Sequence, residues 1–481
     1  MICLTLAHKT IDECVSDVRM NRQYIDLCEL RVDFLCDKDR ERAYLFPSLV
    51  DVPVILTVRR KEDGGAYSAS EKRRKELLLR CLDGDFAYVD IESDIKKGDV
   101  EEKAKQKGVK IIRSLHDFSG VPSDIYSKIY NLSQKGGIAK VCLYLNSFSD
   151  VLTLFRIQEE LKGVEKIVIG MGPYGVCTRI LYHFLGSILT FASSNEAAPG
   201  QLSAAELKRI YRADKINDRT AIYGIIGNPV SHSFSPVIHN QGFKTINYNA
   251  VYVPFLVDNI RAFFSLAETL KIRGFSVTIP FKNEVLSFLG NVTREVKQIG
   301  SCNTVVRVPG MWKGINTDYY GFIAPVLPEI ESSRIKSALV IGAGGASKAI
   351  VWALRNYGVK VIILNRTLER AEDLARMNFC QYDSLDNISK YSKTVDLIVQ
   401  TTPSGMVPYE DENPAEGYVF SGNEIAYDIV YKPKMTKFLI EAEKAGCTLK
   451  FGSQMLIEQG KLQFEAFTGY HYPQSIILDE E

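Results

Sequence analysis

Several signatures of common protein classes are missing from this sequence. The ten cysteines include no C-x-x-C pair and the six histidines form no ligand-like cluster, so we expect neither a metal site nor a disulfide framework. The longest nearly uncharged run, at 180–192, is too short to cross a bilayer. Lysine plus arginine (59) nearly balance aspartate plus glutamate (58), which leaves no overall field to attract nucleic acid or an anionic membrane.

The first residues, MICLTLAHKT, contain no basic region followed by an apolar core. This pattern predicts no signal peptide. Together with the unpaired cysteine spacing, it indicates a reduced, cytoplasmic protein whose partners are small molecules.

A chain of 481 residues is too long for one core, and its first half alternates short β-rich runs with helical patterns. Such alternation favours parallel strands joined by right-handed crossovers. The runs lie at 2–6, 24–32, 54–58, 86–91, 109–115, 138–145, 166–171 and 188–192. Eight such units predict a closed (β/α)8 TIM barrel, with an open doubly wound sheet as the alternative.

Unusual polar residues gather where these predicted strands end, and barrel active sites lie at that end. A strand-end arginine or glutamate can equally be a solvated residue, and a lone histidine can be structural. Lys140 is harder to explain in this way because it lies inside an apolar run. If it points inward, burial should lower its pKa, and the neutral amine could attack a ketone to form a Schiff base.

Seven short motifs follow one another along this half of the chain. They are ELRVD (29–33), TVRR (57–60), VDIE (89–92), SLHDF (114–118), Lys140 itself, MGPYGVCTR (171–179) and APGQ (198–201). In this order they resemble type I 3-dehydroquinate dehydratase. The resemblance implies that Lys140 forms an imine with the substrate ketone. It also implies that His116, oriented by Glu92, removes the adjacent proton and later protonates the leaving hydroxyl.

The same resemblance implies a set of groups that hold the substrate carboxylate and hydroxyls, with the arginine forks matched to the carboxylate. The set is Glu29, Arg31, Arg59, Glu92, Arg179 and Gln201. The sequence departs from the family at Ala197, where a serine is usual. One hydroxyl contact to the substrate is therefore expected to be absent.

A polar, charged stretch at 212–219 separates the two halves, and we place a domain boundary there rather than a long surface loop within one domain. A strand at 221–226 follows. Ser233 and Ser235 come next and face the same way in an extended chain. Because Pro236 suits the first turn of a helix, the two hydroxyls predict either a carboxylate clamp or simple helix caps.

A glycine-rich turn joins an apolar strand at 339–341 to a helical pattern. Glycines let the backbone approach a phosphate, and the following helix directs its free N–H groups at the same anion. Ser347 stands where a third glycine is often found, and it is still small. The expected cofactor contacts are Gly342, Ala343, Gly344, Gly345, Ala346 and Ser347, and the alternative is an ordinary strand-to-helix turn.

The residues after the next strand indicate which cofactor binds. Binders of the non-phosphorylated cofactor place an acidic residue there, on the ribose hydroxyls. This chain has Asn365, Arg366 and Thr367 instead. A guanidinium and a hydroxyl suit a 2′-phosphate, so the pattern favours NADP over NAD. The alternative is an ordinary solvated arginine at a helix start.

Further motifs occur in the second half. They are VTIPFK (277–282), GSCNTV (301–306), GINTDYYG (314–321), TTPSGM (401–406), DIVYKP (428–433) and GSQMLIEQG (452–460). The set is similar to shikimate dehydrogenase across 221–470. The similarity implies that Ser233 and Ser235 bind the substrate carboxylate and that Lys282 and Asp318 act at the reacting carbon. The remaining implied contacts are Thr278, Asn303, Tyr431 and Gln459 on the ring hydroxyls and Gly452 on the cofactor.

Together these patterns predict an α/β protein of three parts. A TIM barrel at 1–213 precedes a two-lobed dehydrogenase, with a substrate lobe at 220–330 completed by 452–481 and a Rossmann-type NADP lobe at 334–450. The resemblances imply dehydration of 3-dehydroquinate to 3-dehydroshikimate, then NADPH-dependent reduction to shikimate, in aromatic amino acid biosynthesis. Two rival hypotheses are a catalytically inactive ligand-sensing regulator on the same folds and an unrelated Schiff-base aldolase fused to a reductase.

Overall fold

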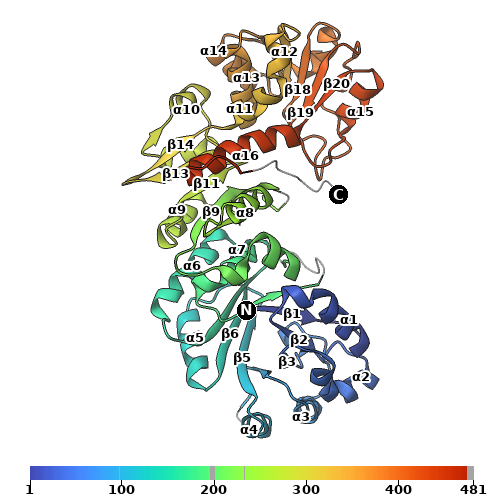
Figure 1. Cartoon of the computed structure of the whole chain (residues 1–481), viewed down its shortest axis with the longest axis vertical. Coiled ribbons are helices and arrows are strands. Elements are labelled where there is room, and N and C mark those ends of the chain that lie inside the picture. The colour runs from blue at the N-terminus through green and yellow to red at the C-terminus, as the bar shows by residue number, and fades with distance from the viewer. Residues whose placement is uncertain (97, 195–200, 232, 474–481) are drawn as a thin grey trace. The chain divides into compact units, whose positions relative to one another are not determined.

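The computed structural model describes residues 1–481 except 97, 195–200, 232 and 474–481 (Figure 1). Within the described residues the named strands form three sheets. One compact unit comprises Met1–Gly224, Asn228–Pro236 and Asn247–Ile272. The other comprises Ile225–Gly227, Val237–Ile246 and Arg273–Glu481. Among the described helices, none combines the length and apolarity that a membrane span requires.

The first sheet is the predicted barrel. Its strands are β1 (Ile2–Leu6), β2 (Leu27–Arg31), β3 (Val54–Thr57), β4 (Tyr88–Glu92), β5 (Lys110–Asp117), β6 (Ile138–Tyr144), β7 (Lys166–Met171) and β8 (Thr190–Ala192). They lie in the order β7-β6-β5-β4-β3-β2-β1-β8, and every neighbouring pair is parallel. Lys166 on β7 forms a parallel bridge with Ser187, just before β8, and this bridge brings the two ends of the sheet together. The predicted eight-stranded barrel is therefore confirmed, and it is nearly closed.

Helices connect successive barrel strands, as the right-handed crossover rule requires. They are α1 (Ile11–Asn21), α2 (Asp37–Arg42), α3 (Glu71–Cys81), α4 (Asp99–Gln106), α5 (Ile125–Gln134), α6 (Phe148–Glu160) and α7 (Val176–Ile180). Local capping fixes where some of them begin. At α1, for example, Thr10 and Glu13 form a capping box, which satisfies N–H groups that lack an intrahelical partner.

The second sheet is mixed. Its strands are β9 (Ala221–Gly227), β10 (Ala250–Leu256), β11 (Gly274–Val277), β12 (Asn291–Val292), β13 (Thr304–Val308) and β14 (Met311–Ile315), in the order β10-β9-β11-β13-β14-β12. β13 is antiparallel to both β11 and β14, while β12 and β14 are parallel. The helices of this region are α8 (Ser235–Thr245), α9 (Ile260–Thr269) and α10 (Arg294–Ile299).

The third sheet is fully parallel. Its strands are β15 (Ser337–Ile341), β16 (Lys360–Asn365), β17 (Gln381–Ser384), β18 (Leu397–Gln400), β19 (Ile425–Asp428) and β20 (Thr448–Phe451). The order β17-β16-β15-β18-β19-β20 is that of a dinucleotide-binding doubly wound sheet, with its crevice beside β15. The accompanying helices are α11 (Asp318–Ile323), α12 (Leu327–Glu331), α13 (Gly345–Asn356), α14 (Leu368–Asn378), α15 (Lys437–Lys444) and α16 (Gly452–Thr468).

Apolar residues cover both faces of this parallel sheet. Along β15, Ala338 and Val340 belong to one buried cluster, whereas Leu339 and Ile341 belong to another. Strands whose two faces are covered by helices read as continuous apolar runs, which is why SALVI shows no polar alternation. The predicted Rossmann-type architecture is confirmed.

Asp428, at the end of β19, is a fully buried carboxyl group. Its Oδ1 accepts the N–H of Val430 at 2.9 Å and its Oδ2 accepts the hydroxyl of Thr436 at 2.6 Å. Burial raises the pKa of Asp428 to about 7, and these two hydrogen bonds only partly oppose the shift. This side chain ties the two ends of the loop that carries Tyr431.

Asp428→Asn should change how stability depends on pH. The folded chain holds this proton more tightly than the unfolded chain, so its contribution is complete below about pH 3.8 and is lost as the pH rises through about 7. The thermal unfolding midpoint of the wild type, relative to the variant, should therefore fall across this range. The matched control is Asp383→Asn, because a hydrogen bond from Asn387 lowers the pKa of Asp383 and the effect should have the opposite sign. Parallel curves for the wild type and Asp428→Asn would contradict the assignment.

Candidate active sites

Lys140 points into the barrel, as its place in the alternating strand predicts. Its neighbours on the same face of β6, Ile138 and Cys142, belong to a buried cluster to which seven of the eight strands contribute. The Lys140 ammonium lies 4.2 Å from the ring centre of Phe191 on β8. Only 3% of Lys140 is exposed. A charged amine at such a place needs charged or polar partners.

Two carboxylates supply those partners. Lys140 Nζ lies 2.9 Å from Oδ2 of Asp90 on β4 and 3.4 Å from Oε1 of Glu29 on β2. Burial alone would lower the pKa of Lys140, but these two charges outweigh it and raise the pKa above its ordinary value. The expectation of a resting neutral amine is therefore wrong. The lysine rests as an ammonium ion and must lose a proton before it can attack a carbonyl.

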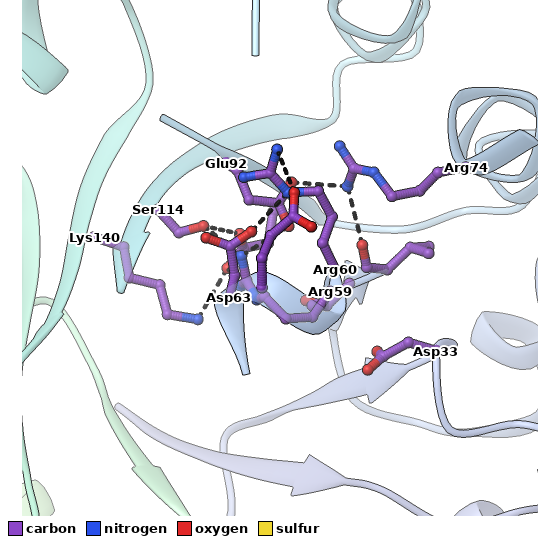
Figure 2. A network of polar contacts seen from close by, with 12 residues as sticks. Asp33, Arg59, Arg60, Asp63, Arg74, Glu92, Ser114 and Lys140 are labelled. Atoms are coloured by element: carbon purple, nitrogen blue, oxygen red, sulfur yellow. Dashed lines mark hydrogen bonds and ion pairs between the residues drawn. The ribbon is translucent and has the colours of Figure 1, made fainter. Parts of the chain in front are cut away.

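Arg59 holds Asp90 in place. Its Nη2 lies 2.8 Å from Oδ2 of Asp90, and its Nη1 lies 3.1 Å from Glu92 and 2.6 Å from the Ser114 hydroxyl (Figure 2). Ser114 in turn donates to Oδ1 of Asp90 at 2.5 Å. Burial would raise the pKa of Asp90, but Arg59 and Lys140 outweigh it and keep the group ionised. In this arrangement Arg59 serves two buried carboxylates rather than an incoming one.

Glu92 does not occupy the position that the sequence suggested. Its Oε1 faces Arg59, and its Oε2 lies 2.7 Å from Nη1 of Arg74 on α3. Both carboxylate oxygens therefore bind arginines, and the contacts do not show Glu92 orienting His116. The reason is charge pairing, because a buried carboxylate gains most from guanidinium partners that can bind through two donors.

His116 lies on β5, two residues after Ser114 and hence on the same inward face. Burial, reinforced by the charges of Arg59 and Lys140, holds the pKa of His116 well below its ordinary value. The imidazole is therefore neutral at pH 7. Within the described part of the chain its Nδ1 has no hydrogen-bond partner. A neutral ring with an unpaired nitrogen can act as a general base.

Arg179, on α7, is a buried guanidinium of a different kind. Its Nη1 donates to the carbonyl of Phe191 at 3.1 Å, while its Nε has no hydrogen-bond partner among the residues that the structure describes. Burial lowers the pKa of Arg179. Over the same described ranges, no carboxylate forms an ion pair with it. An unpaired buried cation favours binding of an anion, in agreement with the expected substrate carboxylate.

The remaining predicted barrel residues are less closely connected. Arg31 binds Asp33 through both Nε and Nη2, at 3.0 and 2.8 Å. Gln201 is half-buried. Ala197 lies outside the described residues.

In the second half, four predicted residues come together. Lys282 donates to Oδ2 of Asp318, the first residue of α11. Asn303 donates to the other oxygen of Asp318 at 2.8 Å, and it also lies 3.4 Å from Oε1 of Gln459 on α16. Asp318 and Asn303 are almost fully buried, and Lys282 is half-buried. The result is a lysine whose ammonium is fixed by one oriented carboxylate.

For the other predicted substrate contacts, the structure gives their burial and their nearest neighbours in the chain. The hydroxyl of Ser233 accepts the N–H of Ser235, the first residue of α8, at 3.2 Å, which is the capping geometry. The carboxylate clamp therefore stays a prediction alongside this cap. Thr278, directly after β11, and Tyr431, in the loop after β19, are half-buried. Gly452 is buried at the start of α16.

The glycine turn after β15 is shaped for close approach. Gly342 has φ +115°, and a Cβ there would lie 2.4 Å from the Thr401 hydroxyl. Ser347 is fully buried, and its hydroxyl accepts the N–H of Gly344 at 3.0 Å and bonds Thr401 at 2.7 Å. The serine thus braces the turn instead of merely replacing a glycine. A Cβ on Gly345 would lie 3.2 Å from Lys282, so the turn adjoins this lysine.

The turn after β16 exposes two guanidinium groups. Asn365 donates to the carbonyl of Thr367 at 2.8 Å and shapes the start of α14. Arg366, just before α14, is exposed, and so is Arg370, in the first turn of that helix. Arg370 was not among the residues predicted from the sequence.

Asp90 was likewise not among the residues predicted from the sequence. The signal was present, because Asp90 and Glu92 lie two residues apart on one strand and must share a face. An ionisable residue at the middle of an otherwise apolar strand requires a buried partner.

These features define a class of protein: a two-enzyme chain in which a lysine-bearing barrel precedes a two-sheet reductase of the dinucleotide-binding type. Family models agree. They match type I 3-dehydroquinase over residues 2–218, the shikimate dehydrogenase substrate binding domain over 225–305, and shikimate / quinate 5-dehydrogenase over 327–416.

Known proteins extend the match to the whole chain. The bifunctional 3-dehydroquinate dehydratase/shikimate dehydrogenase of Arabidopsis thaliana is 34% identical, covering 99% of this chain and 83% of the relative. A shikimate dehydrogenase (NADP(+)) of Caldanaerobacter subterraneus is 39% identical over 55% of this chain and 98% of its own length. The crystal structure of shikimate dehydrogenase from Aquifex aeolicus is 37% identical, covers 54% of this chain and 96% of its own, and has a TM-score of 0.50. The chain belongs to the bifunctional 3-dehydroquinate dehydratase/shikimate dehydrogenase family.

Asp90→Asn tests the charge state of Lys140. Without the nearer carboxylate, burial is opposed mainly by Glu29, and the pKa of Lys140 should fall. The measurement is the pH dependence of Lys140 carbamylation by cyanate, read by peptide mass mapping. Asp33→Asn is the matched control, because Asp33 is equally buried but pairs with Arg31. An unchanged titration midpoint in Asp90→Asn would show that Asp90 does not set the charge.

Proposed function

We propose that the barrel dehydrates 3-dehydroquinate to 3-dehydroshikimate and that the second half reduces this product to shikimate with NADPH. The observation that carries the proposal is Lys140, buried and facing into the barrel, beside a neutral His116. Both halves have the matching family assignment, and the full-length Arabidopsis relative bears both activities in its name.

In the barrel, Lys140 first gives up a proton, and the neutral His116 is the nearby group able to accept one. The amine then adds to the ketone carbon, and protonated His116 gives its proton to the resulting hydroxyl, which leaves as water. This step forms the iminium and restores the neutral imidazole. His116 removes a proton from the adjacent carbon as the electron pair moves towards the iminium nitrogen. The neighbouring carbon–oxygen bond breaks, and His116 returns its proton to the departing hydroxyl, which leaves as water. Hydrolysis of the remaining imine releases the product and restores the amine.

The positions of the charged side chains favour this series of reaction steps. Arg179, the buried arginine without an ion-pair partner in the described structure, is proposed to bind the substrate carboxylate. Glu29, beside Lys140, and Gln201, in the last barrel loop, are proposed to contact the ring hydroxyls. Arg59 is proposed to act through Asp90, since its donors are engaged there.

In the second half, Lys282 holds a proton that can be given to the ketone oxygen as it becomes negatively charged. Bound NADPH would supply the hydrogen and the electron pair to the carbon. Asp318 fixes the ammonium of Lys282, and Asn303 fixes Asp318. The other proposed substrate contacts are Ser233 and Ser235 for the carboxylate and Thr278, Tyr431 and Gln459 for the hydroxyls.

The chain's own residues fit NADP. Gly344 is exposed with open space where a Cβ would lie, at the start of the 12-residue helix α13. Arg366 and Arg370 expose two cations at the next strand end, where a 2′-phosphate would lie. The bacterial relative is named for NADP(+).

Other assignments remain part of the proposal. The regulator hypothesis has no support, because the catalytic set Lys140, His116, Lys282 and Asp318 is present with the contacts described above.

We propose the predicted division into a barrel, a substrate lobe and an NADP lobe, and a cytoplasmic location. All ten cysteines are free thiols, which supports a reducing compartment. The near-zero net charge of +1 supports small-molecule partners rather than nucleic acid.

Lys140→Ala should separate the two activities. Dehydration should fall by about a thousandfold or more, because the imine cannot form, while reduction of added 3-dehydroshikimate is unchanged. Lys282→Ala should do the reverse. Borohydride reduction of the wild type with 3-dehydroquinate, followed by peptide mapping, should place the mass adduct on Lys140. An adduct on another lysine, or none during turnover, would refute the mechanism.

Arg366→Ala should raise KM for NADPH by about ten- to hundredfold and leave KM for NADH nearly unchanged, because one charge-assisted contact to phosphate is lost. Steady-state reduction with each cofactor is the measurement. Arg376→Ala is the control, since Arg376 is exposed on α14, the helix that follows Arg366, but pairs with Glu372. Equal effects on the two cofactors would rule out the phosphate contact.

A further inference from the structure

Asp258 lies in the turn between β10 and α9, in the sequence assigned to the dehydrogenase substrate domain, yet it contacts the barrel twice. Its Oδ1 accepts the backbone N–H of Phe148 at 3.1 Å. Its Oδ2 accepts the hydroxyl of Tyr174 at 3.1 Å. The segment Asn247–Ile272, which contains Asp258, belongs to the same compact unit as the barrel.

Both contacts fall at the catalytic end of the barrel. Phe148 is the first residue of α6, which follows β6, the strand that carries Lys140. Tyr174 lies between β7 and α7, the short helix that carries Arg179. In a parallel barrel these strand-to-helix loops surround the active site. One carboxylate therefore joins two neighbouring active-site loops.

The start of α6 depends on this contact for one of its free N–H groups. Asp150, in the first turn of the helix, accepts the N–H groups of Asn146 at 2.8 Å and Ser147 at 3.1 Å. The next N–H, that of Phe148, goes to Asp258. A helix start needs acceptors for its first N–H groups, and here the dehydrogenase segment provides one of them.

Aromatic packing fixes the same junction. The Phe148 ring is fully buried, with its centre 6.3 Å from that of Phe255 on β10 and 5.9 Å from that of Phe263 on α9. Phe255 and Phe263 also pack on each other at 5.5 Å. The carboxylate contact of Asp258 therefore stands on a packed apolar base rather than on two mobile surface loops.

The Tyr174 loop passes this constraint to Arg179. The Tyr174 carbonyl accepts the thiol of Cys177 at 3.5 Å. Thr178 donates to the carbonyl of Gly175 at 2.6 Å and accepts the N–H of Gly170, on β7, at 3.1 Å. Four residues lie between Tyr174 and Arg179, and these bonds make that segment a single compact turn.

We propose that Asp258 is a positioning residue for the dehydratase, supplied by the dehydrogenase half of the chain. By holding Tyr174 and the start of α6, it fixes the loop that presents Arg179 to the substrate carboxylate. The inference rests on the proposed function only in taking Arg179 as the carboxylate-binding group. Because Asp258 is itself exposed, its loss should disturb loop geometry more than folding.

The test uses the full-length chain and kinetics of both reactions on the same preparations. The variants are Asp258→Ala, Tyr174→Phe, the double variant and Asp258→Asn. Asp51→Ala is the matched carboxylate control, because Asp51 is an exposed ion-pair partner that precedes β3 at the opposite end of the barrel. Tyr126→Phe, on an exposed tyrosine of α5, is the control for loss of a hydroxyl.

Asp258→Ala should raise KM for 3-dehydroquinate about three- to tenfold with kcat changed less than about twofold, while reduction of 3-dehydroshikimate and the unfolding midpoint stay at wild-type values. The double variant should be no worse than Asp258→Ala, since both changes break one contact. Asp258→Asn keeps an acceptor oxygen and should restore part of the loss. Both controls should match the wild type.

An unchanged KM in Asp258→Ala, or a parallel loss of both activities and of the unfolding midpoint, would overturn the inference. A strictly additive double variant would also overturn it, because Tyr174 would then act independently of Asp258. A wild-type chain without dehydratase activity would overturn the proposed function and this inference with it. Wild-type activity combined with an unaffected Asp258→Ala variant would overturn this inference alone.

Discussion

A lysine ammonium inside a barrel must be neutralised by carboxylates, and the dehydratase site is arranged around this requirement. Each neutralising group is itself buried and needs a partner of the opposite sign. The result is a chain of ion pairs, with positive and negative side chains in alternation, that extends from the barrel interior to the surface. From the inside outward it consists of Lys140, Asp90, Arg59, Glu92, Arg74 and Glu71. Only its last member, whose side chain is 38% exposed, can rely on water.

The two candidate active sites use lysine in different ways, and their surroundings account for the difference. Lys140 lies between two carboxylates and is held as a cation that must be discharged before it can react. Lys282 faces a single carboxylate and is less deeply buried, which suits a group that gives a proton away and recovers it. In the second site Asn303 and Thr317 orient the carboxylate side of the pair, so the lysine has one defined direction.

Much of this was readable in the sequence, for identifiable reasons. Alternating β-rich runs and helical patterns predicted the barrel, because parallel strands covered by helices bury apolar residues on both faces. The glycine turn between an apolar strand and a helical pattern indicated the nucleotide-type sheet. The inward direction of Lys140 followed from alternation along β6. The charge of Lys140 could not be predicted in this way. Burial lowers the pKa of a lysine and nearby carboxylates raise it, and here the carboxylates come from distant strands. Asp90 and Glu29 are far from Lys140 in sequence, and only the folded barrel brings them within 3.4 Å.

The contacts of Glu92 and Asp258 were also beyond sequence reasoning. A carboxylate near a predicted active site can face a histidine or an arginine, and the choice depends on which buried cation lacks a partner. For Asp258, nothing in its turn marks it as different from other exposed aspartates. Its contacts with the barrel depend on the neighbouring aromatic cluster, in which residues of β10 and α9 pack against α6.

The position of Gln459 on α16 bears on how the protein emerges from the ribosome. All the barrel residues assigned to the substrate are synthesised by position 201. Lys282, Asn303 and Asp318 are made next, but they must wait for α16, far towards the carboxyl end, before their ring of contacts is complete. A nascent chain therefore acquires the components of its two catalysts one after the other, in the order in which the substrate would meet them.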